Sequence, residues 1–121
     1  MKQRVLVVDD NEALAENLAE ILCLEGFDAS FESDPTQVVE QNHCFDTYLV
    51  DVAMPKLDGW SLKREMERRC PSARVLLMSA YDDMSLRGGV DAATVPLRKP
   101  VELVTLLQLL APEVEREQVR R

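Results

Sequence analysis

The segment YLVDVAMPKLDGW, residues 48–60, carries the clearest indication of the fold. Its opening residues form a nearly apolar run that carries one carboxylate, Asp51, and the run breaks at Pro55. Asp58 and Gly59 then provide a turn that opens a helix. A buried strand followed by a helix is the repeating unit of α/β proteins. In such proteins, ligands bind beyond the carboxyl ends of the strands, which is where Asp51 is expected.

The same strand-then-helix pattern occurs five times along the chain. Strands are expected at residues 5–8, 27–31, 48–52, 74–79 and 94–100, because these runs are apolar or alternate between apolar and polar residues. An amphipathic or helix-compatible stretch follows each of them. This alternation predicts an α/β fold with a single doubly wound, five-stranded parallel sheet, helices on both faces and right-handed crossovers.

Length and charge limit the class of protein further. A chain of 121 residues suits one domain, expected over residues 1–111, with residues 112–121 as a charged tail or the start of a linker. The start at Met1 favours an N-terminal or stand-alone domain. The formal net charge of −8 disfavours direct binding to nucleic acid or to an anionic membrane.

The cysteines and the N-terminus predict a cytoplasmic protein. Cys23, Cys44 and Cys70 form no C-x-x-C pair, and an odd, scattered set fits a reducing cytosol better than a disulfide framework. The apolar run that begins at Val5 ends after four residues in two acids, which excludes a signal peptide. No apolar run approaches the length of a membrane span.

Polar residues stand at the predicted strand ends. These residues are Asp9 and Asp10 after the first strand, Asp51 in the third, Ser79 after the fourth and Lys99 after the fifth. Two carboxylates about 4 Å apart repel by roughly 4 kcal/mol at an effective dielectric constant of about 20. A hard cation would relieve this repulsion, and Mg²⁺ suits an oxygen-only site that also holds a phosphoryl group.

Four motifs carry a family resemblance. VLVVDD, DVAMPKLDG, LLMSA and KP occur in that order, each in the expected element, and together they are specific. Over about residues 4–110 the chain resembles the receiver domain of bacterial two-component response regulators. The resemblance implies the flavodoxin-like strand order 2-1-3-4-5. It also implies signal transduction in which Asp51 accepts a phosphoryl group from a phosphohistidine on a sensor histidine kinase or phosphotransfer protein.

The resemblance also assigns roles within the site. Asp10 is expected to bind Mg²⁺ directly and Asp9 directly or through water, and Asp51 and the backbone carbonyl of Ala53 complete the metal site. Ser79 and Lys99 are the other two residues that the resemblance places at the site. They are expected to contact the phosphoryl oxygens, by a hydrogen bond and by charge respectively.

One segment departs from the family pattern. Pro96 occupies the position, three residues before Lys99, where the family usually has Tyr or Phe. The interval from Gly89 to Lys99 is also longer than usual. Because proline cannot donate to a sheet ladder, the last strand is expected at an edge. Residues 81–95 are expected to be irregular or mobile, and the usual aromatic switch is in doubt.

The last predicted helix carries more apolar residues than one face needs. Within residues 101–110 these are Val101, Leu103, Val104, Leu106, Leu107, Leu109 and Leu110. A helix that covers a sheet needs one apolar stripe. The surplus predicts a homodimer or effector contact, and a more deeply buried helix is the alternative.

Three other functions compete with phosphoryl acceptance. An aspartyl-nucleophile phosphohydrolase would need a second acid two residues after Asp51, where Ala53 stands, so no enzyme is expected beyond self-catalysed phosphoryl acceptance and autodephosphorylation. A flavin-binding module would need hydroxyls and glycines after the first strand, where DDNEA stands. A receiver-like docking module that does not use phosphorylation remains open because of Pro96.

Overall fold

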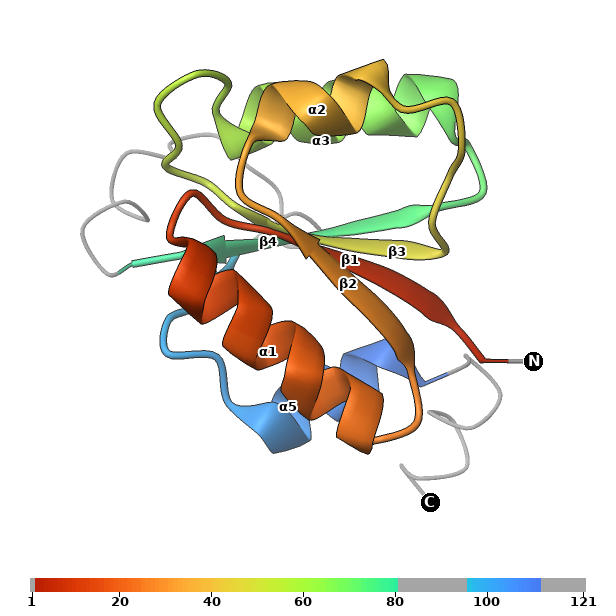
Figure 1. The fold of residues 1–121 in the computed structure, drawn as a ribbon, viewed down its shortest axis with the longest axis vertical. Helices are drawn as coiled ribbons and strands as arrows, with labels where there is room; N and C mark the ends of the chain where they lie inside the picture. Colours follow the sequence, from red (N-terminus) through yellow and green to blue (C-terminus); the bar gives the residue numbers. More distant parts are fainter. Residues whose placement is uncertain (1, 81–95, 112–121) are drawn as a thin grey trace.

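A five-stranded parallel sheet forms the centre of the molecule (Figure 1). The computed structural model describes residues 2–80 and 96–111. The strands are β1 (Arg4–Val8), β2 (Asp28–Glu32), β3 (Thr47–Asp51), β4 (Arg74–Ser79) and β5 (Leu97–Arg98). Their spatial order is β2-β1-β3-β4-β5, and every neighbouring pair is parallel. The predicted fold class and strand order are therefore confirmed.

Helices cover both faces of the sheet. The described helices are α1 (Glu12–Leu24), α2 (Pro35–Glu40), α3 (Gly59–Arg69) and α5 (Leu103–Leu110). α1 and α5 lie on one face, and α2 and α3 lie on the other (Figure 1). In the described part of the chain, no helix is both long enough and apolar enough to span a membrane.

The central strands are buried because the side chains on their two faces pack into two separate hydrophobic cores. Along β3, Tyr48 and Val50 pack in the core beneath α2 and α3, whereas Leu49 packs in the core beneath α1 and α5. All five residues of β3 are buried. A strand covered on both faces reads as a continuous apolar run, which is why YLV marked it in the sequence.

Side-chain caps fix where the helices begin. The carboxylate of Asp58 accepts a hydrogen bond from the Ser61 N–H and opens α3. Asp34 caps α2 in the same way through Thr36, and Pro35 occupies the first turn. These caps satisfy backbone donors that a helix start leaves unpaired. Each of these helices therefore begins at a defined residue after its strand, α2 at Pro35 and α3 at Gly59.

The two edge strands are less buried than the central ones. No residue of β2 is fully buried, and β5 has only two residues. β5 begins directly after Pro96, which is buried and has no N–H to extend the ladder. The predicted edge position of the last strand is confirmed. The expectations for residues 81–95 and for the tail at 112–121 fall outside the described residues.

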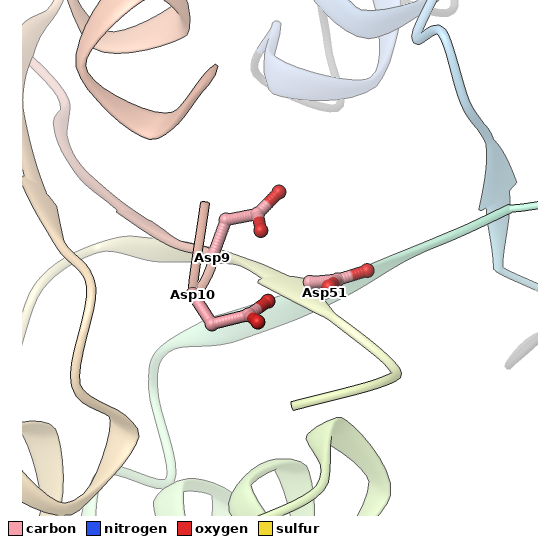
Figure 2. Close-up of side chains that lie close together, drawn as sticks. All are labelled: Asp9, Asp10 and Asp51. Carbon is pink, nitrogen blue, oxygen red and sulfur yellow. The ribbon is translucent and has the colours of Figure 1, made fainter. Parts of the chain in front are cut away.

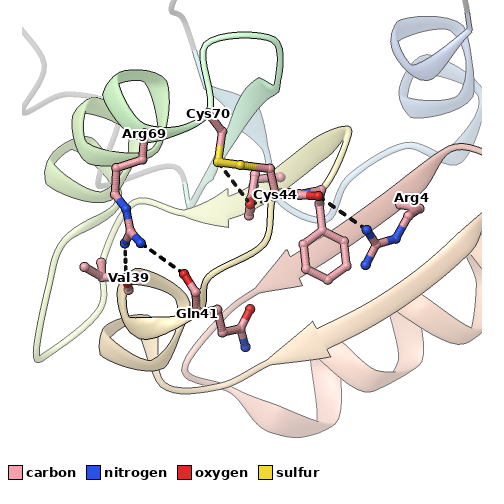
Figure 3. The surroundings of a disulfide bond; sticks show 8 residues. Arg4, Val39, Gln41, Cys44, Arg69 and Cys70 are labelled. Atoms are coloured by element: carbon pink, nitrogen blue, oxygen red, sulfur yellow. Dashed lines mark hydrogen bonds between the residues drawn. A yellow bond between two sulfur atoms is a disulfide. The ribbon is translucent and has the colours of Figure 1, made fainter.

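The scattered cysteines argued against disulfides, and this expectation is wrong for one pair. Cys44 and Cys70 form a disulfide (Figure 3). Cys23 is free. The pairing was not visible in the sequence because 26 positions separate the two residues. Packing of α3 against β3 brings them to a Cα–Cα distance of 5.9 Å, within the range that a disulfide requires. Cysteine usage therefore no longer argues for a reducing compartment.

Candidate functional site at the carboxyl ends of β1 and β3

Three aspartates lie together where β1 and β3 end. Val8 pairs with Val50, so the two strands end level with each other. Asp9 and Asp10 follow β1, and Asp51 is the last residue of β3. One carboxylate oxygen from each lies within 4.8 Å of the others. Figure 2 shows the three side chains extending from the neighbouring strand ends to the same side.

Lys99 reaches this acidic cluster from the next strands along the sheet. Its backbone N–H donates to the Ser79 carbonyl at 2.9 Å, which aligns the segment after β5 with the end of β4. The Lys99 Nζ lies 2.7 Å from Asp9 Oδ2 and 3.2 Å from Asp51 Oδ1. Lys99 therefore bridges two of the three carboxylates, and the sequence-predicted convergence of these residues is present in the structure.

The charges in the cluster do not balance. Burial, together with the nearby charge of Asp9, raises the pKa of Asp51 from 3.8 to about 6, although Lys99 acts in the opposite direction. For Lys99, burial lowers the pKa, but its hydrogen bond to Asp9 and the charge of Asp51 outweigh this and raise it above 10.5. Lys99 therefore stays protonated near neutral pH. The charged form of Asp51 is disfavoured by its surroundings, and any added positive charge nearby would stabilise it.

Asp9 has defined partners on both of its oxygens. Oδ1 accepts from the Asn11 N–H at 3.0 Å, and Oδ2 accepts from Lys99. Asn11 is also the N-cap of α1, since its side chain accepts from the Leu14 N–H. The turn after β1 thus holds Asp9 rigidly. Asn11 was not singled out in the sequence, although an Asn before a helical stretch is a recognisable cap.

The backbone directly after Asp51 is held by the start of α3 and by β4. The Gly59 N–H donates to the Val52 carbonyl at 2.8 Å, and the Val52 N–H donates to the Met78 carbonyl at 2.8 Å. A Cβ on Gly59 would collide with the Asp51 carbonyl oxygen and lie 2.8 Å from the Val52 Cα. The sequence marks Gly59 only as part of a turn. In the structure, only glycine allows α3 to begin this close to Asp51.

Ser79, Ala53 and Asp10 occupy different environments at the rim. Ser79 is fully buried, and its hydroxyl donates to the Ala80 carbonyl at 2.9 Å. Ala53 is exposed in the loop two residues after Asp51. Asp10 is exposed too. The exposed aspartate beside two buried ones leaves the cluster open to solvent on one side.

The donor set fits a hard divalent cation. The available ligands are carboxylate oxygens, with no histidine or thiolate among the grouped residues. Oxygen-only sets of this kind suit Mg²⁺ better than zinc or copper. A divalent ion would also lower the cost of placing three carboxylates beside a single ammonium.

The fold and this rim define an α/β domain with an acidic oxygen-donor site at the point where the strand order reverses. The family model described as the response regulator receiver domain matches residues 5–111. The chain therefore belongs to the response regulator receiver domain family. Domains of this family are generally signalling modules rather than catalytic enzymes, and they interact with sensor kinases or phosphotransfer proteins.

Individual relatives agree with this assignment. Response regulator MprA from Mycobacterium sp. (strain KMS) is 34% identical over 111 residues, which cover 88% of this chain and 48% of the relative. The chain thus spans about half the length of the curated relatives it matches. A receiver domain structure from Clostridium thermocellum superposes with a TM-score of 0.76 at 25% identity, covering 98% of this chain and 99% of that one. A receiver protein from Pseudomonas putida is 28% identical with a TM-score of 0.69, covering 91% and 96%.

Proposed function

We propose that Asp51 accepts a phosphoryl group from a phosphohistidine on a sensor histidine kinase or phosphotransfer protein. In this step the P–N bond to the imidazole breaks, a P–O bond to an Asp51 carboxylate oxygen forms, and the imidazole leaves as the neutral or protonated base. The added charge then switches a partner or effector surface. The domain that does this extends over residues 1–111, with 112–121 as a tail or linker.

One observation carries the proposal. The Lys99 Nζ lies within 3.2 Å of both Asp9 and Asp51, in a cluster of three carboxylates. Phosphoryl transfer depends mostly on positioning the nucleophile and neutralising charge on the transferred oxygens. Asp51 ends a buried strand, which supports positioning of the nucleophile, and Lys99 contacts its oxygen, which supplies part of the positive charge.

The other rim residues have supporting roles. Asp9, Asp10, Asp51 and the Ala53 carbonyl would hold Mg²⁺, which when bound supplies positive charge beside the phosphoryl oxygens. Lys99 would turn from Asp51 to the phosphoryl group, and its contact with Asp9 keeps it in reach. The Ser79 hydroxyl would exchange its bond to the Ala80 carbonyl for one to a phosphoryl oxygen.

Phosphoryl uptake can be tested with acetyl phosphate and Mg²⁺, followed by intact mass measurement. We expect a gain of one phosphoryl group that requires Mg²⁺ and is lost in Asp51→Asn. Asp46→Asn is the matched control, because Asp46 precedes the other end of the same strand and its carboxylate accepts a backbone bond from Arg4, away from the cluster. An unmodified wild-type mass under these conditions would instead support a docking module independent of phosphate, and sustained phosphate release from small esters would support a phosphohydrolase.

The location and the output surface are part of the same proposal. A cytoplasmic location follows from the proposed kinase partner. The surface of α5 is proposed to form a homodimer or effector contact, since Val104 is 62% exposed while Leu106 and Leu110 are fully buried. Sedimentation of the phosphorylated and unmodified chain tests the homodimer, and a monomer in both states would exclude it.

A further inference from the structure

The two cysteines of the disulfide differ in exposure. Cys44 is an exposed residue in the loop before β3, whereas Cys70, the C-cap of α3, is only 5% exposed. Figure 3 shows the bond between them. Thiol–disulfide exchange begins when an external thiolate attacks one sulfur and the other leaves. Because Cys70 belongs to the core beneath α2 and α3, an incoming thiolate can reach the bond only from the Cys44 side.

The leaving sulfur has a hydrogen-bond donor beside it. The Tyr48 hydroxyl lies 3.9 Å from the Cys70 Sγ. A disulfide sulfur carries no hydrogen, so the hydroxyl is the donor in this pair. Its oxygen accepts the Phe45 N–H at 3.0 Å, which leaves the O–H free to point at the sulfur. A thiolate that forms on Cys70 would therefore be stabilised at the moment it leaves.

The loop is held independently of the disulfide. Arg4 donates to the Cys44 carbonyl at 3.4 Å, and its guanidinium lies 4.6 Å from the Phe45 ring centroid. From the other side, Arg69 donates to the carbonyls of Val39 and Gln41 (Figure 3). These contacts hold the chain on both sides of the loop through backbone carbonyls and a ring, not through the S–S bond. They also allow the disulfide to open while the loop stays in place.

We propose that the Cys44–Cys70 disulfide is a reversible exchange site for a low-molecular-weight thiol. The thiolate attacks the Cys44 Sγ, the S–S bond breaks, and the electron pair goes to the Cys70 Sγ, which leaves a mixed disulfide on Cys44. A second thiol then attacks the external sulfur of the mixed disulfide and releases the Cys44 thiolate. In sum, two small thiols become one small disulfide, and the protein gains two thiols. The reverse reaction restores the bond.

This site is separate from the phosphoryl site. Cys44 precedes the first residue of β3 and Asp51 is its last, so the length of a five-residue strand, about 16 Å, separates the two ends. The proposal does not rest on phosphoryl acceptance. Phosphoryl uptake from acetyl phosphate is accordingly expected at the same rate in the oxidised and the reduced protein.

Glutathione is the probe for the test. A Cys23→Ser chain, which removes the free exposed cysteine, is equilibrated in buffers with graded ratios of reduced to oxidised glutathione, quenched in acid, alkylated and weighed intact. We expect a continuous shift between disulfide and dithiol forms without denaturant, with a glutathionylated intermediate whose peptide mass places the group on Cys44. Reduction only at urea concentrations that unfold the chain, or a glutathionyl group on Cys70, would overturn the proposal.

Three variants separate the roles of the sulfurs and of the hydroxyl. In the Cys23→Ser background, Cys70→Ser should take up glutathione on Cys44, whereas Cys44→Ser should leave the buried Cys70 unmodified; equal uptake by the two would contradict the unequal accessibility. Tyr48→Phe should slow reduction about threefold to tenfold, the factor expected for one hydrogen bond. An unchanged rate would remove Tyr48 from the mechanism, whereas the glutathionyl group on Cys70 would remove Cys70 as the leaving sulfur.

Discussion

The two ends of β3 are held in opposite ways. At its carboxyl end, Asp51 shares a rim with Asp9 and Lys99, where burial and like charge raise the pKa of the carboxylate. Before its amino end, Cys44 is joined covalently to Cys70, which lies against the Tyr48 hydroxyl. The excess negative charge at the Asp51 end lowers the stability of the fold until a cation or a proton binds. The disulfide at the Cys44 end carries no charge and stabilises the fold.

This difference separates the function of the strand from its stability. Three carboxylates beside one ammonium make the rim sensitive to pH, and under the proposed function also to metal and phosphate. The same sensitivity would be harmful if the strand depended on the rim for its position. Gly59, packed on the Asp51 backbone, and the distant disulfide instead hold β3 and α3 together. The charged end can therefore change state while the strand stays fixed.

Breaking the disulfide should have the largest effect on stability. The bond closes a loop of 26 residues that contains β3 and all of α3. In the chain-entropy account a loop of this size contributes about 3.5 kcal/mol. Cys44→Ser should lower the free energy of unfolding of the oxidised protein by about that amount, measured by urea denaturation.

Two controls make this measurement specific. Cys23→Ser changes an exposed, unbridged cysteine and should leave stability within about 0.5 kcal/mol of the wild type. Under a strong reductant, wild type and Cys44→Ser should unfold at nearly the same urea concentration. A persistent gap between them under reducing conditions would show that the serine, not the lost bond, is responsible.

Removing charge from the other end should act with the opposite sign. The folded pKa of Asp51, about 6, lies above its ordinary value of 3.8, so the folded state holds this proton more tightly than the unfolded state. The charged Asp51 therefore lowers the free energy of unfolding. This loss is absent below about pH 4, grows as the pH rises, and is complete above about pH 6. Asp51→Asn should therefore stabilise the metal-free protein at pH 7, by at most about 3 kcal/mol, and by little at pH 4.

Thermal unfolding of both proteins between pH 4 and pH 7.5 in the presence of a chelator checks this sign. The matched variant is again Asp46→Asn, which should leave the pH profile of the wild type unchanged because Asp46 lies outside the cluster. Added Mg²⁺ should narrow the gap at pH 7, since it stabilises only the protein with the full set of carboxylates. An Asp51→Asn protein that is less stable than wild type at pH 7 without metal would contradict the account.

The same comparison shows what the sequence could predict. The rim was predictable because parallel strands bring their carboxyl ends to one edge, so Asp9, Asp51 and Lys99 could be placed together from strand ends alone. The disulfide was not, because it depends on how α3 crosses back over β3 and on which residues then meet. Local pattern carries no information on that distance, and the odd number of cysteines pointed the wrong way.

The close approach at Gly59 was missed for a similar reason. An Asp–Gly pair before a helix is sufficient evidence for a turn and a cap, and both are present. That the glycine is also needed for contact with the Asp51 backbone depends on tertiary packing. Pro96 is the opposite case, because its effect can be inferred from the residue alone. Proline has no N–H, and this correctly predicted that the last strand lies at an edge.

The two ends of α3 provide the smallest test of the contrast. Its end is held by the disulfide, but its start depends on the Asp58 cap, which accepts 2.9 Å and 3.0 Å bonds from the Ser61 N–H and hydroxyl. Burial raises the pKa of Asp58, but these bonds outweigh it and lower the value below 3.8. The stabilisation is therefore present above about pH 4 and is lost as the pH falls through the lowered folded pKa.

Asp58→Ala should lower the free energy of unfolding by about 1 kcal/mol at pH 7, whereas Asp58→Asn, which keeps the cap, should lower it by only a few tenths. Urea denaturation measures both, and equal losses in the two variants would mean that charge, not capping, holds the start of α3.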